Sequence, residues 1–184
     1  MPKQIPSNDI SDPNARSLDG VRFRCTNVSD GAKIHAFVQD SGVLELNSCY
    51  AYLLLCKHFS ETCLIAEQDD TLIGIVLGYL VPNRSDSLFV WQIGIDKRWR
   101  GFGLGRQLLT ELTRQEACRH VRFLEATIAP SNTASANLFR SFAKQKNAPV
   151  VVQPGFTKHD FQVTPETLES FPHEPEKLFR IGPW

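Results

Sequence analysis

The stretch Lys97-Arg98-Trp99-Arg100-Gly101-Phe102-Gly103-Leu104-Gly105-Arg106 carries the clearest chemical signal in the sequence. Its alternating glycines let backbone amides approach an anion without interference from a Cβ atom. A helical pattern begins at Leu104, and the start of a helix supplies partial positive charge. Basic side chains outnumber the one nearby acid, Asp96. We therefore expect this stretch to bind a phosphate or pyrophosphate; the alternative is a glycine-rich turn with no ligand.

The spacing of the glycines separates this stretch from two other phosphate-binding loops. A P-loop requires GxxxxGK[ST], and the chain contains no such string. The dinucleotide-binding pattern GxGxxG fails because Arg106 or Leu108 takes the place of the third glycine. Glu125 falls about where a ribose-binding acid would lie, but one acid does not restore the failed glycine pattern.

Two polar residues interrupt the otherwise apolar run Phe123–Ala129. A carboxylate in such a run must be paired or must face a polar cleft. Glu125 is thus a candidate for binding a substrate ammonium or for acting as a base, and the alternative is an ion-paired or edge-exposed glutamate. Thr127 shares its face of the strand and could donate to a substrate, or could serve only as a β-forming residue.

Four further residues are candidates for the same site. Trp91 could form the wall of a small-molecule pocket or belong to the core. Asp40 could bind an ammonium group or cap the end of a helix. His159 and His173 lie in late loops, where either could bind a substrate carboxylate or act as a base, or could be an ordinary surface histidine.

The composition fits one globular domain of 184 residues with 42% hydrophobic and 22% charged residues. The longest apolar stretch, Gly74–Val81, is far shorter than a membrane span, and no secretory signal opens the sequence. We therefore expect a soluble, cytoplasmic protein with no membrane partner. The formal net charge of +0 and the lack of a long basic stripe argue against a nucleic-acid partner. The five cysteines lack a CxxC pair, so no metal site is expected.

Hydrophobic periodicity predicts the elements that position these residues. Residues 1–19 are polar and predict a mobile tail, and residues 20–184 predict a single domain. Strands are expected at 21–26, 62–67, 71–81, 88–96, 123–129, 150–153 and 177–181. Helices are expected from an N-cap at Ser29 to about residue 40, over 48–59, from 104 to about 118, and over 132–146.

The glycine-rich stretch matches Arg-x-x-Gly-x-Gly as Arg100, Gly103 and Gly105, and on this motif the chain resembles the GNAT family of N-acetyltransferases. The resemblance covers roughly Val21 to Pro183. It implies an α+β fold with a mostly antiparallel twisted sheet of about seven strands and about four helices, with acetyl-CoA as co-substrate and an amine as acceptor. It also implies a homodimer. The implied cofactor-binding residues are Ile93, Ile95, Arg100, Gly101, Phe102, Gly103, Gly105, Arg106, Asn132 and Phe139.

The resemblance also implies how the reaction proceeds. The family's usual oxyanion donor is a splayed backbone amide near Ile93–Ile95, and Gly94 in mid-strand is compatible with a β-bulge there. The family's usual general acid is a tyrosine in the helix that Asn132 opens. Here that position is Phe139, which cannot donate a proton, so the identity of the general acid is left open. No cysteine lies in an activating motif, which favours direct transfer without an acyl-enzyme.

A narrower resemblance rests on segments spread over the whole domain. They are Ser41–Ser48, Tyr52–Cys56, Phe89–Gln92, Leu124–Ile128, His173–Glu176 and Leu178–Pro183. These segments are similar to those of the acetyltransferases that act on L-2,4-diaminobutyrate. That resemblance implies acetylation of the γ-amine, on the route to the compatible solute ectoine. Acetylation of another small diamino acid or amine, or non-catalytic sensing of acyl-CoA, are the alternatives.

Overall fold

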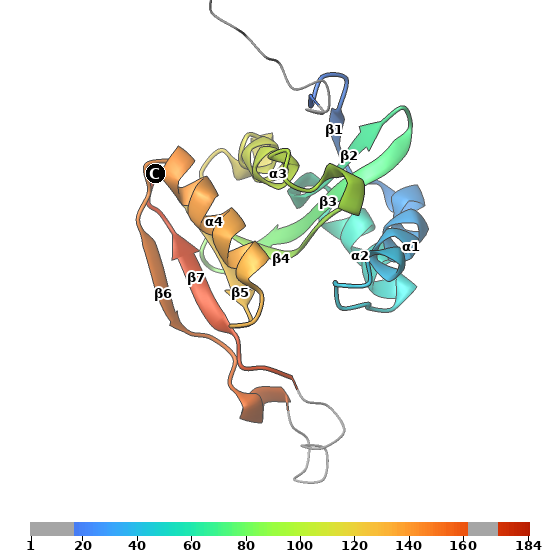
Figure 1. Ribbon diagram of the computed structural model, residues 1–184. Coiled ribbons are helices and arrows are strands. Elements are labelled where there is room, and N and C mark those ends of the chain that lie inside the picture. The colour runs from blue at the N-terminus through green and yellow to red at the C-terminus, as the bar shows by residue number, and fades with distance from the viewer. Residues whose placement is uncertain (1–16, 162–172) are drawn as a thin grey trace, which may run out of the picture.

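The computed structural model describes residues 17–161 and 173–184, which contain one seven-stranded sheet and four α-helices (Figure 1). The strands are β1 (Arg22–Cys25), β2 (Cys63–Gln68), β3 (Thr71–Leu80), β4 (Ser87–Ile95), β5 (Phe123–Ile128), β6 (Val150–Pro154) and β7 (Lys177–Ile181). Their order in the sheet is β1-β2-β3-β4-β5-β7-β6. Neighbouring strands are antiparallel except β4 and β5, which are parallel. The prediction of a mostly antiparallel α+β fold is confirmed.

The helices are α1 (Gly31–Ser41), α2 (Cys49–His58), α3 (Leu104–Thr113) and α4 (Thr133–Gln145). Two predicted helix boundaries are wrong. Asn27, rather than Ser29, caps the first helical segment, a short 3-10 turn that precedes α1. The helix α3 stops at Thr113 because Gln115 adopts an extended backbone, and a separate 3-10 turn follows. None of the helices within the described ranges has the length and apolar character needed to cross a membrane.

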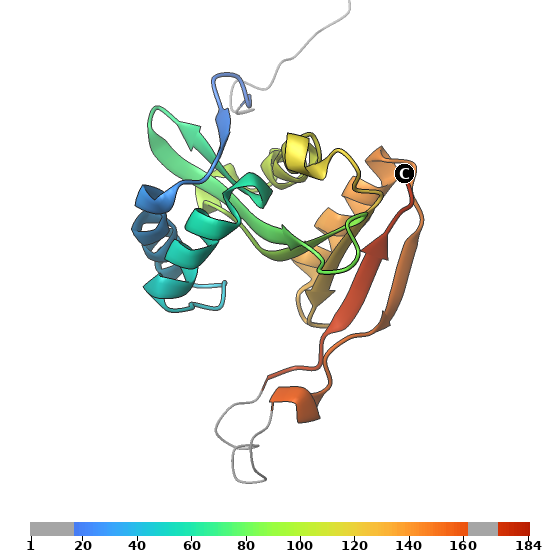
Figure 2. The same cartoon turned by 180° about the vertical axis from the view of Figure 1, so that it is seen from behind.

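Two hydrophobic clusters cover the two faces of the sheet. Side chains alternate along each strand, so Leu64 and Val76 pack with α3 and α4, whereas Ile65 and Ile75 pack with α1 and α2. The helix α3 buries its four leucines, Leu104, Leu108, Leu109 and Leu112. The two helix pairs therefore lie on opposite faces, as Figures 1 and 2 show from front and back. Most of the predicted tail, residues 1–16, is outside the described residues, and Leu18 packs against the core.

The centre of the sheet opens between β4 and β5. The two strands pair only from Ser87–Phe89 to Phe123–Glu125, although both continue further. Beyond that point, β4 is paired on its β3 side only. A parallel pair that separates part-way leaves alternate backbone groups of each strand without a strand partner. The resulting wedge is the place in the sheet where another extended group can hydrogen-bond to β4.

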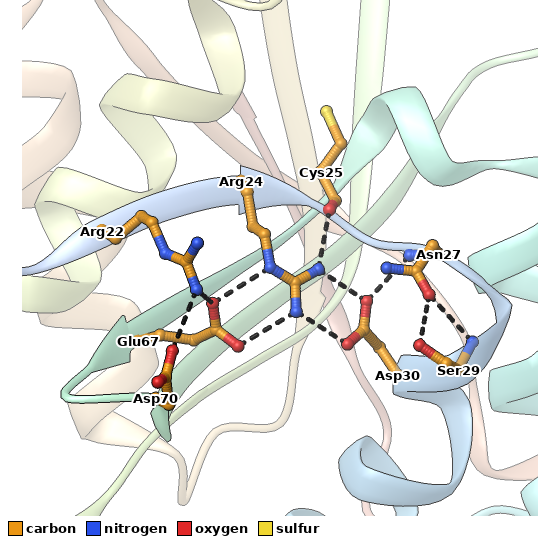
Figure 3. Close-up of polar contacts among 8 residues, drawn as sticks. All are labelled: Arg22, Arg24, Cys25, Asn27, Ser29, Asp30, Glu67 and Asp70. Atoms are coloured by element: carbon orange, nitrogen blue, oxygen red, sulfur yellow. Dashed lines mark hydrogen bonds and ion pairs between the residues drawn. The ribbon is translucent and has the colours of Figure 1, made fainter.

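A network of ion pairs attaches β1 to β2 and to the turn before α1 (Figure 3). The guanidinium of Arg24 donates to both carboxylate oxygens of Asp30, at 2.7 and 2.8 Å, and to both of Glu67, at 3.0 Å. Arg22 also binds Glu67, at 2.9 Å. Asp30 is 1% exposed, and hydrogen bonding from Arg24 lowers the pKa of its carboxyl below the ordinary value. The network thus satisfies two buried carboxylates at one edge of the sheet.

Candidate active site

The glycine-rich stretch connects β4 to α3. Asp96 caps a short 3-10 turn, Lys97–Trp99, by accepting from the Arg98 amide, and its carboxylate also binds the Arg98 guanidinium at 2.9 Å. Gly101 and Gly103 have φ values of +87° and +82°, in the left-handed region that favours glycine. Gly103 is the N-cap of α3. The first amides of that helix have no partner within it, so they are available to an anion.

A cavity of about 1030 Å³, here named the loop cavity, lies in front of this connection. Its walls come from the end of β4, the glycine-rich stretch and the start of α4. It is lined by nine of the ten predicted cofactor-binding residues: Ile93, Ile95, Arg100, Gly101, Phe102, Gly103, Gly105, Arg106 and Asn132. The tenth, Phe139, does not line it. The side chain of Asn132 caps α4 through its oxygen, which accepts from the Ser135 amide at 3.0 Å.

A second cavity of about 910 Å³, here named the wedge cavity, begins where β4 and β5 separate. The two cavities adjoin, because they share the lining residues Val43, Leu44, Ile93, Ala129, Asn132 and Ser135. Besides Ile93 and Asn132, the wedge cavity is lined by five further predicted site residues: Trp91, Glu125, Thr127, Phe139 and His173. A small molecule in the wedge cavity can therefore meet a molecule in the loop cavity beside Ile93.

The irregularity in β4 is not at Gly94, and the prediction of a bulge there is wrong. Gly94 pairs regularly with Ile75, whereas the register with β3 shifts between Val90 and Gln92, so the extra residue is Trp91. Gly94 is required for close packing instead, because a Cβ atom would lie 2.6 Å from Leu44. The bulge lies two residues before Ile93, at the junction of the cavities.

Glu125 is 2% exposed and is held by two arginines. The guanidinium of Arg84 donates to its two carboxylate oxygens at 2.8 and 2.9 Å, and Arg180 of β7 also binds it. The ion-paired alternative for Glu125 is therefore the one that the structure adopts. The hydrogen bonds that Arg84 donates to Glu125 raise the pKa of Arg84, which thus stays cationic. Both carboxylate oxygens of Glu125 are already occupied by guanidinium donors, and this geometry argues against Glu125 as the base.

His173 lies between two walls of the wedge cavity. Its ring stacks on Phe161, with centroids 3.9 Å apart, and its Nε2 atom lies 3.7 Å from the carboxylate of Glu45. Glu45 belongs to the loop between α1 and α2, which Gln92 of β4 holds by donating to the Glu45 carbonyl at 2.8 Å. Gln92 in turn accepts from the buried hydroxyl of Tyr52. The chain on either side of the cavity is thus fixed by polar contacts.

Two predicted site residues are not brought to either cavity. Asp40 is exposed near the end of α1, and His159 is exposed in the 3-10 turn Lys158–Phe161. The sequence interpretation also missed charged residues that do line the wedge cavity, namely Arg84, Glu45 and Glu176. Arg84 lies in a short polar loop, where only its pairing with a strand 41 residues away distinguishes it from a surface arginine. No group of three or more His, Cys, Asp or Glu side chains suited to a metal occurs within residues 17–161 and 173–184.

Comparison with known proteins supports the arrangement. The sequence profile of the Acetyltransferase (GNAT) family matches residues 33–143. The L-2,4-diaminobutyric acid acetyltransferase of Bordetella parapertussis is 42% identical over 179 residues, which cover 97% of this chain and 92% of that protein. The enzyme of the same name from Marinococcus halophilus is 41% identical over 168 residues, covering 91% of this chain and 93% of that protein.

A solved structure matches as well. The diaminobutyrate acetyltransferase of Paenibacillus lautus, in complex with its substrate L-2,4-diaminobutyric acid and coenzyme A, superposes with a TM-score of 0.78 and 38% identity, covering 89% of this chain and 95% of that one. The ribosomal-protein-S18-alanine N-acetyltransferase of Escherichia coli shares the fold alone, with a TM-score of 0.60 at 16% identity. The glycine-rich connection, the wedge in the sheet and these matches agree: the chain belongs to the GNAT family of acetyltransferases.

Proposed function

We propose that the protein transfers the acetyl group of acetyl-CoA to the γ-amine of L-2,4-diaminobutyrate and so makes N-γ-acetyl-diaminobutyrate for ectoine synthesis. The observation that carries this proposal is the junction of two cavities beside Ile93, one lined by a phosphate-binding loop and the other by charged groups that suit a diamino acid. The named relatives, which are similar to this chain over nearly their whole length, support the choice of substrate.

The loop cavity is the proposed site of acetyl-CoA. The first amides of α3 and the guanidinium of Arg100 would hold the pyrophosphate. The pantetheine arm would lie in the wedge and pair with the free edge of β4 at Ile93 and Ile95, and the Asn132 amide group would donate to it. This places the thioester near Ile93, at the entrance to the wedge cavity.

The wedge cavity is the proposed acceptor site, because its charges complement those of diaminobutyrate. The substrate carries two ammonium groups and one carboxylate. Among the described lining residues, Arg84 is the one lysine or arginine, and Glu45 and Glu176 are carboxylates in addition to the ion-paired Glu125. Trp91 and Thr127 would form the wall along which the substrate lies.

The chemistry requires a neutral amine, since an ordinary alkyl ammonium has a pKa near ~10. Glu45 and His173 line the cavity and are within reach of each other, so this pair would accept the proton, directly or through water. The amine nitrogen then attacks the thioester carbon, and a backbone amide of β4 near Ile93 stabilises the oxyanion. The C–S bond breaks to release CoA thiolate, and the new amide nitrogen gives up its second proton to water or to the departing thiolate.

The cysteines support direct attack without an acyl-enzyme. None of the five lines either cavity. Burial raises the pKa of the Cys63 thiol to about 12 and that of Cys118 to about 11, so neither is a thiolate near pH 7. The only nucleophile that the reaction needs is therefore the amine of the substrate, which forms when its ammonium group loses a proton.

The test is product formation with acetyl-CoA and one acceptor at a time, detected by mass: diaminobutyrate, diaminopropionate, ornithine and lysine. We expect the highest kcat/KM with diaminobutyrate. Gly103→Val is the matched control, because a side chain at a φ of +82° distorts the phosphate loop and should abolish acetyl-CoA binding. A higher kcat/KM for ornithine or lysine than for diaminobutyrate would contradict the proposed substrate. Binding of acetyl-CoA without turnover of any acceptor would contradict the proposal that the protein is an enzyme.

The assembly and setting of the enzyme are further parts of this proposal. We infer a homodimer of single-domain subunits that works in the cytoplasm during osmotic stress, where acetyl-CoA is available, with small molecules rather than nucleic acid or membranes as partners. The zero net charge supports the absence of a nucleic-acid partner. Light scattering after gel filtration should give twice the chain mass of 20.7 kDa; a mass of one chain would contradict the dimer.

A further inference from the structure

The ion cluster Arg84–Glu125–Arg180 does not balance in charge. Within these three residues two guanidiniums share one carboxylate, and the nearby Asp86 carboxylate, which acts on Arg84 electrostatically, offsets part of the excess positive charge. Arg180 is engaged elsewhere as well, since its guanidinium lies 3.8 Å above the ring centroid of Phe123 and it donates to Ser87. Arg84 is the member of the cluster that lines the wedge cavity as a cation, with 48% of its side chain exposed. The excess charge is therefore presented to the cavity.

The geometry of Arg84 leaves room for a second carboxylate. Glu125 binds the two terminal nitrogens, Nη1 and Nη2, one to each oxygen. A guanidinium has five N–H donors in a planar fork, so this end-on pair leaves the Nε–H and an adjacent N–H along one edge. Two parallel donors of this kind match a carboxylate. Because Glu125 fixes the plane of the guanidinium, the remaining edge is held in one orientation before a ligand arrives.

The position of Arg84 suits the length of the proposed substrate. Glu125, to which Arg84 is bound, pairs with Phe89 of β4, and Ile93 lies four residues further along that strand, at the junction with the loop cavity. Allowing for the bulge at Trp91, Phe89 and Ile93 are roughly 10–13 Å apart along β4, which sets the scale of the distance between the Glu125 end of the wedge cavity and the junction. A carboxylate bound to Arg84, the four bonds from it to the γ-nitrogen and a near-attack contact with the thioester together span about 11 Å.

We propose that Arg84, oriented by Glu125, binds the α-carboxylate of the acceptor and thereby selects the amine that lies four bonds away from it. The inference rests on the proposed function, and it assigns Glu125 as a positioning residue rather than a base. Binding of the carboxylate would place a second negative charge against the two guanidiniums of the cluster. Diaminopropionate is one bond shorter than diaminobutyrate and ornithine is one bond longer. With the carboxylate bound to Arg84, the side-chain nitrogen of either would be out of position to attack the thioester carbon.

The experiment compares diaminobutyrate with 1,3-diaminopropane, which has the same amines but no carboxylate, in the wild-type enzyme and in Arg84→Gln. We expect the substitution to lower kcat/KM for diaminobutyrate by roughly 10- to 100-fold, mainly through KM. We expect no more than about a twofold change for diaminopropane, since it makes no contact with the Arg84 edge. Equal losses on both acceptors would show that Arg84 acts only through the structure, and would overturn the proposal.

Controls separate this inference from the proposed function. Arg114→Gln, which breaks another glutamate pair remote from both cavities, should leave both acceptors unchanged. Arg84→Lys keeps the positive charge but loses the two parallel N–H donors of the guanidinium. This variant should therefore keep only part of the preference for diaminobutyrate over diaminopropane, and its product should be a mixture of α- and γ-acetylated diaminobutyrate. If the wild-type enzyme acetylates diaminopropane with the same kcat/KM as diaminobutyrate, the carboxylate site is refuted but the proposed function is not. A wild-type enzyme inactive on both would refute the proposed function.

Discussion

Two clusters of arginine and buried carboxylate lie in this sheet, and they differ in charge and in surroundings. The Arg24 cluster, near the edge formed by β1, joins Arg22 and Arg24 to Asp30, Glu67 and Asp70, with more acids than bases (Figure 3). The Arg84 cluster, beside the wedge, has more bases than acids. None of the Arg24 cluster lines either cavity, whereas Arg84 and Glu125 line the wedge cavity.

The use of the guanidinium donors distinguishes ion pairs that stabilise the fold from ion pairs that can also bind a ligand. In the Arg24 cluster, one guanidinium uses four donors on two carboxylates and the fifth on the Cys25 carbonyl, so it has none left for a ligand. In the Arg84 cluster, a guanidinium keeps one edge free and faces a cavity. Burial of the carboxylate is similar in both, so burial alone does not identify the functional cluster.

The largest effect on stability is expected in the Arg24 cluster. Arg24→Met leaves Asp30 and Glu67 without their main partner, which should lower the free energy of unfolding by about 3–5 kcal/mol. Urea titration followed by circular dichroism measures this loss. The KM values for both substrates should stay unchanged below the melting transition; a changed KM for diaminobutyrate would place this cluster in the site.

The largest effect on activity is expected in the other cluster. Glu125→Ala frees Arg84 to move, so kcat/KM for diaminobutyrate should fall by roughly 10- to 100-fold while acetyl-CoA affinity stays constant. Isothermal titration with acetyl-CoA and initial rates over a range of acceptor concentrations separate the two quantities. Unchanged turnover would remove Glu125 from the site.

The Arg24 cluster should also respond to acid. The folded-state pKa of Asp30 is below its ordinary value of 3.8 because Arg24 donates to it. The stability that this carboxylate contributes is therefore present above about pH 3.8 and is lost as pH falls through the lower, folded-state pKa. The stability difference between wild type and Arg24→Met should shrink as pH is lowered from 7 to 3; a difference independent of pH would mean that packing, not charge, stabilises the cluster.

The smallest effect is expected from an exposed pair. Arg114 binds Glu111 at 2.9 Å on the surface of α3, with 64% of the arginine side chain exposed. Arg114→Gln should change the free energy of unfolding by no more than about 0.5 kcal/mol, because solvent screens such pairs. The same urea titration measures it, and a loss as large as that of Arg24→Met would remove the distinction between exposed and buried pairs.

Local sequence signals predicted most of the fold and the position of the glycine-rich connection between a strand and a helix. The glycines of 101–105 act through their own backbone, and the strands alternate in a pattern that can be read without knowing their neighbours. The bulge was predicted at Gly94 because glycine often marks one, whereas its position depends on the register between β3 and β4. Arg84 was missed for the same reason, since its partner lies on a distant strand.

A competition between amine acceptors tests directly whether the enzyme selects diaminobutyrate and acetylates its γ-amine. The wild-type enzyme receives acetyl-CoA and equal concentrations of diaminobutyrate, diaminopropionate, ornithine and lysine, and nuclear magnetic resonance identifies the acetylated nitrogen of each product. We predict that N-γ-acetyl-diaminobutyrate dominates the mixture. Acetylation at the α-nitrogen would contradict the proposed selection of the γ-amine, and a product mixture without preference among the four acceptors would contradict the proposed substrate.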